Sequence, residues 1–154
     1  MARKKIGKRK RVAAGLRKLK LDKSSGGYVE AAKKAAERFA SDYERRYGRK
    51  LEYSMDDVRV LDTELEKNYE ENTLTPEELV YMGYYLGEIL RRNVGGTYEF
   101  REDPGVLVIK CLEIAAFPIL KVQKALKEKR PGALEAYVFL FAKKVSDKKE
   151  KGTQ

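Results

Sequence analysis

The stretch TPEELVYMGYYLGEILRRNVGGTYEFREDPGVLVIKCLEIAAF, residues 75–117, decides the fold because the spacing of its apolar residues changes within it. Its first half begins at Thr75 and Pro76, a typical helix start, and repeats apolar residues every three to four positions. After the glycine pair at 95–96 the period falls to about two, as in strands. The stretch therefore predicts a helix followed by an antiparallel hairpin at about 97–117. Its last residues are either a bent continuation of the second strand or a third strand.

Helical patterns flank this stretch on both sides. Apolar spacing of three to four residues predicts helices at about 28–47, 56–70 and 119–129. A last element at about 133–145 contains a run, 137–142, that is apolar on every side. We expect a helix at the centre of the core, with a strand as the alternative. The predicted fold class is α+β, with helices packed on a short antiparallel sheet.

The chain is predicted to have three parts. Residues 1–27 are a basic, flexible arm with its linker, 28–145 are one domain, and 146–154 are a charged tail. A body of this size can enclose a single hydrophobic core. The single cysteine, Cys111, cannot form an internal disulfide and is expected to be a buried, inert thiol.

The charge of the chain is concentrated at its N-terminus. The formal net charge is +10, and residues 1–23 hold eleven basic side chains against one acid, Asp22. Removing these from the totals of 34 and 24 leaves 23 basic and 23 acidic residues, so the rest of the chain is neutral. We call residues 1–23 the basic segment. Its cationic residues are Arg3, Lys4, Lys5, Lys8, Arg9, Lys10, Arg11, Arg17, Lys18, Lys20 and Lys23.

Such a segment favours contact with a polyanion. Lysines and arginines on a flexible chain neutralise phosphates and release counterions, which gives salt-sensitive, sequence-independent affinity. No aromatic residue precedes Tyr28, so the segment itself supplies no base stacking. We therefore predict contact with the phosphate backbone of duplex DNA or structured RNA rather than base reading. An anionic lipid surface, an acidic protein, or a purely solubilising role are the alternatives.

Residues 52–90 are acidic, with eleven carboxylates against two basic residues. Three interpretations stay open: a surface for a basic partner, a surface that receives the basic segment within one chain or across a homodimer, or a solvated helix face. We favour the last of these. The acids lack the spacing of a calcium loop, and no metal is expected.

The helix predicted after Thr75 has two unusual features. Gly83 and Gly87 lie four apart, and we expect close packing against a neighbour rather than a ligand. A row of side chains on one face is either a protein-binding or base-stacking patch, or is covered by the helix at 28–47 with its hydroxyls satisfied at the rim, which we favour. The row comprises Tyr81, Tyr84, Tyr85, Glu88 and Arg92.

Several classes of protein are disfavoured by what the sequence lacks. There is no histidine, no glycine-rich phosphate loop and no nucleophile–base pair, so we expect no enzyme, no metal and no cofactor. A concave pocket around Gly83, Gly87 and Glu88 would be the first support for catalysis. No apolar stretch is long enough for a membrane span, and no secretory signal is evident. The low content of asparagine and glutamine is typical of thermophiles.

One resemblance is carried by Met82-Gly83, Leu86-Gly87-Glu88 and Gly95-Gly96-x-Tyr98, followed by Phe117-Pro118 before the closing helices. Over about residues 53–142 the chain resembles a family of small, uncharacterised bacterial α+β domains with a Leu-Gly-Glu helix. The resemblance implies helices on a short antiparallel sheet and implies no activity. Tyr98 stands where the family pattern has tryptophan, and the basic segment is not part of the likeness.

The sequence thus predicts a non-enzymatic, cytoplasmic, nucleic-acid-associated protein that uses its basic segment. The alternative is a protein-interaction module that uses the acidic residues 52–90 or the tyrosine row, with a protein partner or a second copy of the chain.

Overall fold

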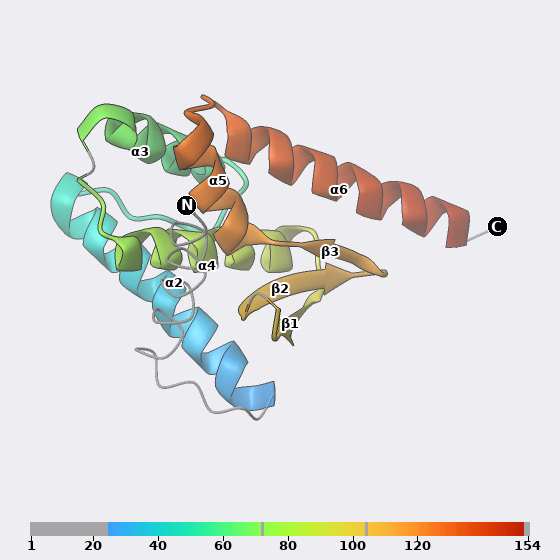
Figure 1. The fold of residues 1–154 in the computed structure, drawn as a ribbon. Coiled ribbons are helices and arrows are strands. Elements are labelled where there is room, and N and C mark those ends of the chain that lie inside the picture. The colour runs from blue at the N-terminus through green and yellow to red at the C-terminus, as the bar shows by residue number, and fades with distance from the viewer. Residues whose placement is uncertain (1–24, 72, 104, 153–154) are drawn as a thin grey trace.

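The computed structural model describes residues 25–71, 73–103 and 105–152 (Figure 1). The elements, in chain order, are α2 (Ser25–Tyr47), α3 (Asp57–Glu71), α4 (Pro76–Asn93), β1 (Thr97–Arg101), β2 (Val106–Cys111), β3 (Ile114–Ala116), α5 (Pro118–Glu128) and α6 (Ala133–Gly152). Helices pack against a three-stranded antiparallel sheet, so the α+β prediction is confirmed.

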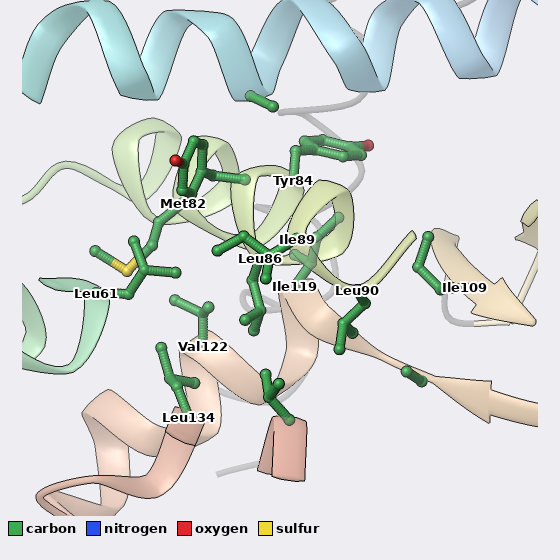
Figure 2. Close-up of a cluster of buried hydrophobic side chains, with 14 of the residues drawn as sticks. Leu61, Met82, Tyr84, Leu86, Ile89, Leu90, Ile109, Ile119, Val122 and Leu134 are labelled. Atoms are coloured by element: carbon green, nitrogen blue, oxygen red, sulfur yellow. The ribbon is translucent and has the colours of Figure 1, made fainter. Parts of the chain in front are cut away.

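Helix α4 is the centre of the structure, between α2 on one side and α5 on the other (Figure 2). Its residues from 82 to 90 are all buried. One apolar stripe of α4, which includes Met82, Leu86 and Leu90, faces α5, where it meets Ile119 and Val122. The opposite face is also buried because α2 lies along it. A helix that is covered on two sides has to be apolar nearly all round, as this one is.

The start of α4 agrees with the helix signal in the sequence. The Thr75 hydroxyl accepts a hydrogen bond from the Glu78 amide at 3.1 Å, and Pro76 takes the first turn. The cap satisfies one of the four amides that a helix start leaves without partners. The Glu78 carboxylate accepts a bond from Arg46 of α2 at 3.2 Å, which ties the two helices together.

The sheet has the order β1-β2-β3, and both pairs are antiparallel. Gly96 makes the close step from α4 to β1, because its φ is +107° and a Cβ there would lie 2.7 Å from the Lys110 carbonyl oxygen. Of the two alternatives for the end of the stretch, the third strand is present. It is joined to β2 by Leu112 and Glu113, which both have positive φ, 50° and 68°.

Helix α6 differs from its prediction in two ways. The element is helical, but it runs to Gly152, so residues 146–152 are not a tail. It is also not central. One stripe (Leu134, Val138, Phe141, Val145) is buried, while Phe139 and Leu140 are 71% and 50% exposed. The apolar run predicts burial on every side, but only one side of α6 has neighbours, chiefly α3 (Figure 1).

Candidate functional site

The eleven basic side chains of the basic segment lie outside the described residues. The described chain starts with α2, whose Tyr28 ring stacks on Phe100 of β1 with centroids 4.8 Å apart. This stack fixes the first turns of α2 against the sheet. The start of the described chain therefore lies beside β1.

The tyrosine row on α4 is not a surface patch. Tyr84, Tyr85 and Glu88 are 1%, 0% and 0% exposed, Tyr81 is half-buried, and Arg92 is exposed. The alternative that the helix at 28–47 covers them is the correct one, because α2 packs along this face of α4. The protein-interaction role assigned to these side chains therefore does not fit the structure, since a partner cannot reach the buried ones.

The hydroxyl of Tyr85 is the centre of a polar network between α4 and the loop before α3. It donates to Asp57 Oδ2 at 2.6 Å and accepts from the Tyr53 amide at 2.9 Å. The Glu52 amide donates to the same carboxylate oxygen at 2.8 Å. Burial, together with the bond to Asp57, raises the pKa of Tyr85. The expectation of satisfied hydroxyls is met by Tyr85 but not by Tyr84, whose hydroxyl has no hydrogen-bond partner among the described residues.

Glu88 forms a second buried cluster at the end of α4. Its carboxylate accepts from Arg91 Nε at 2.8 Å and Nη2 at 3.1 Å, from Arg92 Nε at 3.3 Å, and from the Tyr98 hydroxyl at 2.6 Å. Burial acts to raise the pKa of Glu88, but the bonds from Arg91 and Tyr98 and the two positive charges outweigh it and leave that pKa lowered. The carboxylate is held ionised, and its contacts join α4 to β1. Such a group is suited to structure rather than to proton transfer.

The glycines of α4 serve helix packing. A Cβ at Gly83 would lie 2.7 Å from Ile119 Cα, and one at Gly87 would lie 3.4 Å from Pro118 and 3.6 Å from the Tyr98 hydroxyl. The expectation of a close neighbour rather than a ligand is therefore confirmed. The space beside Glu88 that a catalytic pocket would need is filled by α5 and β1.

The acidic stretch 52–90 is only in part a solvated face. Four of its eleven carboxylates are buried, and each accepts hydrogen bonds: Asp57, Asp62, Glu64 and Glu88. Asp62 of α3 accepts from the Leu134 and Glu135 amides at 2.9 and 3.0 Å and so caps the start of α6. Burial raises the pKa of Asp62, although both amide bonds act against that rise.

A narrow cleft lies between the C-terminal half of α2, the middle of α3 and the start of α4. Tyr43, Tyr47 and Tyr81 line it, with Asp42, Arg46 and Glu78 at its rim. Its volume of about 20 Å³ admits a single water molecule. The half-buried Tyr81 therefore has a place in this cleft and is not part of a broad binding face.

An exposed surface on α6 combines apolar and positively charged side chains. The sequence predicts burial on every side of this helix instead. Phe139 and Leu140 point away from the body, and one turn later come Lys143 and Lys144, both exposed. The C-terminal end of α6 extends beyond the sheet (Figure 1). The apolar run 137–142 by itself predicts burial on every side, so the exposed face is evident only from the packing of α6.

An open concavity of about 620 Å³ lies between the end of α6 and the β2–β3 turn. It is lined by Leu112 and Glu113 of the turn and by Lys148, Lys149 and Gly152 of the helix. It adds two further lysines to the cationic surface of α6.

Two further findings concern the described residues only. Within 25–71, 73–103 and 105–152, no group of three or more Cys, Asp or Glu side chains is placed to hold a metal ion. No helix in this part of the chain is long and apolar enough to cross a membrane.

Comparisons with protein-family models, with curated proteins and with solved structures gave no match to this chain.

Proposed function

We propose that this protein binds nucleic acid in the cytoplasm, without catalysis, and that the basic segment supplies the contacts to the phosphate backbone. One observation carries the proposal: residues 1–23 hold the entire net charge of the chain, +10, while the remainder carries equal numbers of acids and bases. A concentrated positive charge on a neutral body gives affinity for a polyanion without dependence on base sequence.

Two features of the body support a binding role over a catalytic one. The space around the α4 glycines is filled by Ile119, Pro118 and Tyr98, and the buried Glu88 is held ionised by its arginine and tyrosine partners. Of the acids in residues 52–90, four are engaged inside the body, which reduces the negative surface that could compete for the basic segment.

The test compares three forms of the full-length protein and one truncation by mobility shift or fluorescence anisotropy. Removal of residues 1–23 should abolish binding to a duplex oligonucleotide probe. Replacement of all eleven basic residues of the segment by glutamine, at unchanged length, should do the same. A variant with the order of residues 2–23 scrambled keeps the charge and should bind as the original does.

Salt dependence checks the mechanism. A protein that makes six to ten phosphate contacts loses about 10³- to 10⁵-fold in affinity between 50 and 200 mM salt. We expect a loss of this order for the intact chain and a shallow dependence for the glutamine variant. Unchanged affinity after truncation, or a scrambled variant that no longer binds, would contradict the proposal.

A further inference from the structure

The outer face of α6 is the feature that the proposed function leaves unexplained. Phe139 is 71% exposed and Leu140 50%, and Ala136 beside them is exposed too. At 3.6 residues per turn, these positions lie on the side of α6 opposite its buried stripe. Full burial of a phenylalanine or leucine side chain contributes about 1.5–3 kcal/mol, so a partner that covered both would gain free energy from their burial.

The side chains that follow these residues on α6 are positively charged. Lys143 and Lys144 follow Phe139 and Leu140 by four residues, about 6 Å along the helix axis. Lys148, Lys149 and Lys151 continue the exposed lysines toward the end of α6. Residues 143–152 hold five lysines against Asp147 and Glu150, a net charge of +3. The Phe139 ring lies one helical turn from the ammonium groups of Lys143 and Lys144. This arrangement suits a partner that has flat apolar surfaces next to negative charges.

Unpaired bases with their phosphates have this chemistry. In a duplex the bases are already stacked on each other, so a side chain reaches a base face only by unstacking a step, which costs a few kcal/mol. In a single strand every base has a free face, and aromatic side chains stack on it while cationic groups follow the backbone. The basic segment has no aromatic residue, so a stacking platform has to come from the body. Phe139 is the most exposed aromatic side chain in the described part of the chain.

We propose that the outer face of α6 binds single-stranded nucleic acid, with a base stacked on Phe139 and the neighbouring phosphates on Lys143 and Lys144. The proposal rests on the proposed function and adds a substrate class to it. The basic segment gives affinity for any nucleic acid, and α6 gives a preference for unpaired strands.

The chain has no tryptophan, so Phe139→Trp introduces a single fluorescent reporter at the proposed platform. We expect oligo(dT) or oligo(U) to quench its emission, because a stacked base quenches indole, and a blunt duplex of equal length to leave it unchanged. Tyr47→Trp is the matched control. Tyr47 is an exposed aromatic residue, 46% exposed, on α2, and its variant should show no quenching.

Affinity measurements separate stacking from general apolar contact. Phe139→Ala should weaken binding to the single strand by roughly 5- to 100-fold and leave duplex binding within about 2-fold. Phe139→Leu keeps the apolar character but removes the ring, and should behave like Phe139→Ala. Lys143→Gln with Lys144→Gln should reduce the salt slope for single strands by about 0.7 for each phosphate that is no longer neutralised. The exposed pair Arg49→Gln with Lys50→Gln is the control for charge.

The outcomes distinguish the two proposals. If the intact protein binds neither single strands nor duplexes, the proposed function fails, and this inference with it. If the intact protein binds both with steep salt dependence but Phe139→Trp is not quenched, the proposed function stands and the inference is wrong. A blue shift with phosphatidylserine vesicles in place of quenching would assign α6 to a membrane surface. An emission that changes with protein concentration alone would assign it to self-association. Either result would overturn the inference.

Discussion

Two neighbouring tyrosines on α4 provide a controlled test of the buried polar network. Tyr84 and Tyr85 are both fully enclosed, at 1% and 0% exposure, and replacement by phenylalanine removes the same single oxygen from each. The Tyr85 hydroxyl bonds to Asp57 at 2.6 Å and to the Tyr53 amide at 2.9 Å. The Tyr84 hydroxyl has no hydrogen-bond partner within the described residues.

The expected effects have opposite signs. Tyr85→Phe loses a hydrogen bond to a charged group and leaves a backbone amide without its acceptor, which should lower the free energy of unfolding by about 2–3 kcal/mol. Tyr84→Phe removes a buried hydroxyl whose burial no partner among the described residues offsets. Its free energy of unfolding should stay unchanged or rise by about 1–2 kcal/mol.

The assay is urea unfolding followed by far-UV circular dichroism, on the full chain at pH 7. The two variants should differ in midpoint and share the slope of the original protein, because neither substitution changes the surface exposed on unfolding. The two variants serve as controls for each other, because both positions lie on α4, are equally buried and lose the same atom. If Tyr84→Phe destabilises the protein as much as Tyr85→Phe does, the network described around Asp57 does not stabilise the fold.

Two more predictions concern α4. Gly83→Ala should destabilise the protein by about 1–2 kcal/mol, because its Cβ would meet Ile119 at 2.7 Å. Gly87→Ala has room, 3.4 Å to Pro118, and should gain up to about 1 kcal/mol of helix propensity; thermal unfolding of both variants checks this, and equal effects would refute the packing argument. Glu88 has a folded pKa below its ordinary value of 4.5, so its stabilisation is complete above that pH and is lost as the pH falls through the folded pKa. Glu88→Gln should therefore cost about 3 kcal/mol at pH 7 and progressively less as the pH falls through the folded pKa of Glu88, and a cost that does not change with pH in urea unfolding would contradict the ion-pair role.

The elements that could be predicted from the sequence are those with local signals. The start of α4 is marked by Thr75 and Pro76, and the change from helix to strand by the glycines at 95–96. In each case one residue type is needed for a local reason, a cap or a positive φ, and the structure uses it in that way. The burial of Cys111 followed from its apolar neighbours and is also confirmed.

The parts that could not be predicted depend on distant residues. The end of α6 has no apolar pattern after Val145, and the helix continues through lysine-rich sequence without a core to face. Leu112 and Glu113 occupy left-handed conformations that usually select glycine or asparagine, so the turn between β2 and β3 gave no sequence signal. Only the assembled sheet fixes that turn.

In the candidate site, too, some features can be predicted from the sequence and others cannot. The charge of the basic segment can be counted from the sequence alone, whereas the exposure of a side chain cannot. Tyr84 and Tyr85 lie on what a helical wheel presents as an outer face, yet α2 covers them. Phe139 lies in the most apolar run of its helix, yet it is largely exposed. The cover of the tyrosines by α2, the favoured interpretation, is confirmed, whereas the central burial expected for Phe139 is wrong. A wheel shows which residues share a side and not which side meets the rest of the protein.

The cap that Asp62 places on α6 has a consequence for the order in which the chain is assembled. This carboxylate precedes the Leu134 amide that it accepts from by 72 residues, and the helix that it caps is synthesised after α3. We therefore expect the start of α6 to become ordered only after α3 has folded, and its outer surface to form only then. A proteolytically shortened chain without α3 would present that surface poorly, so a partner that recognises it would select molecules in which α3 and α6 are both folded.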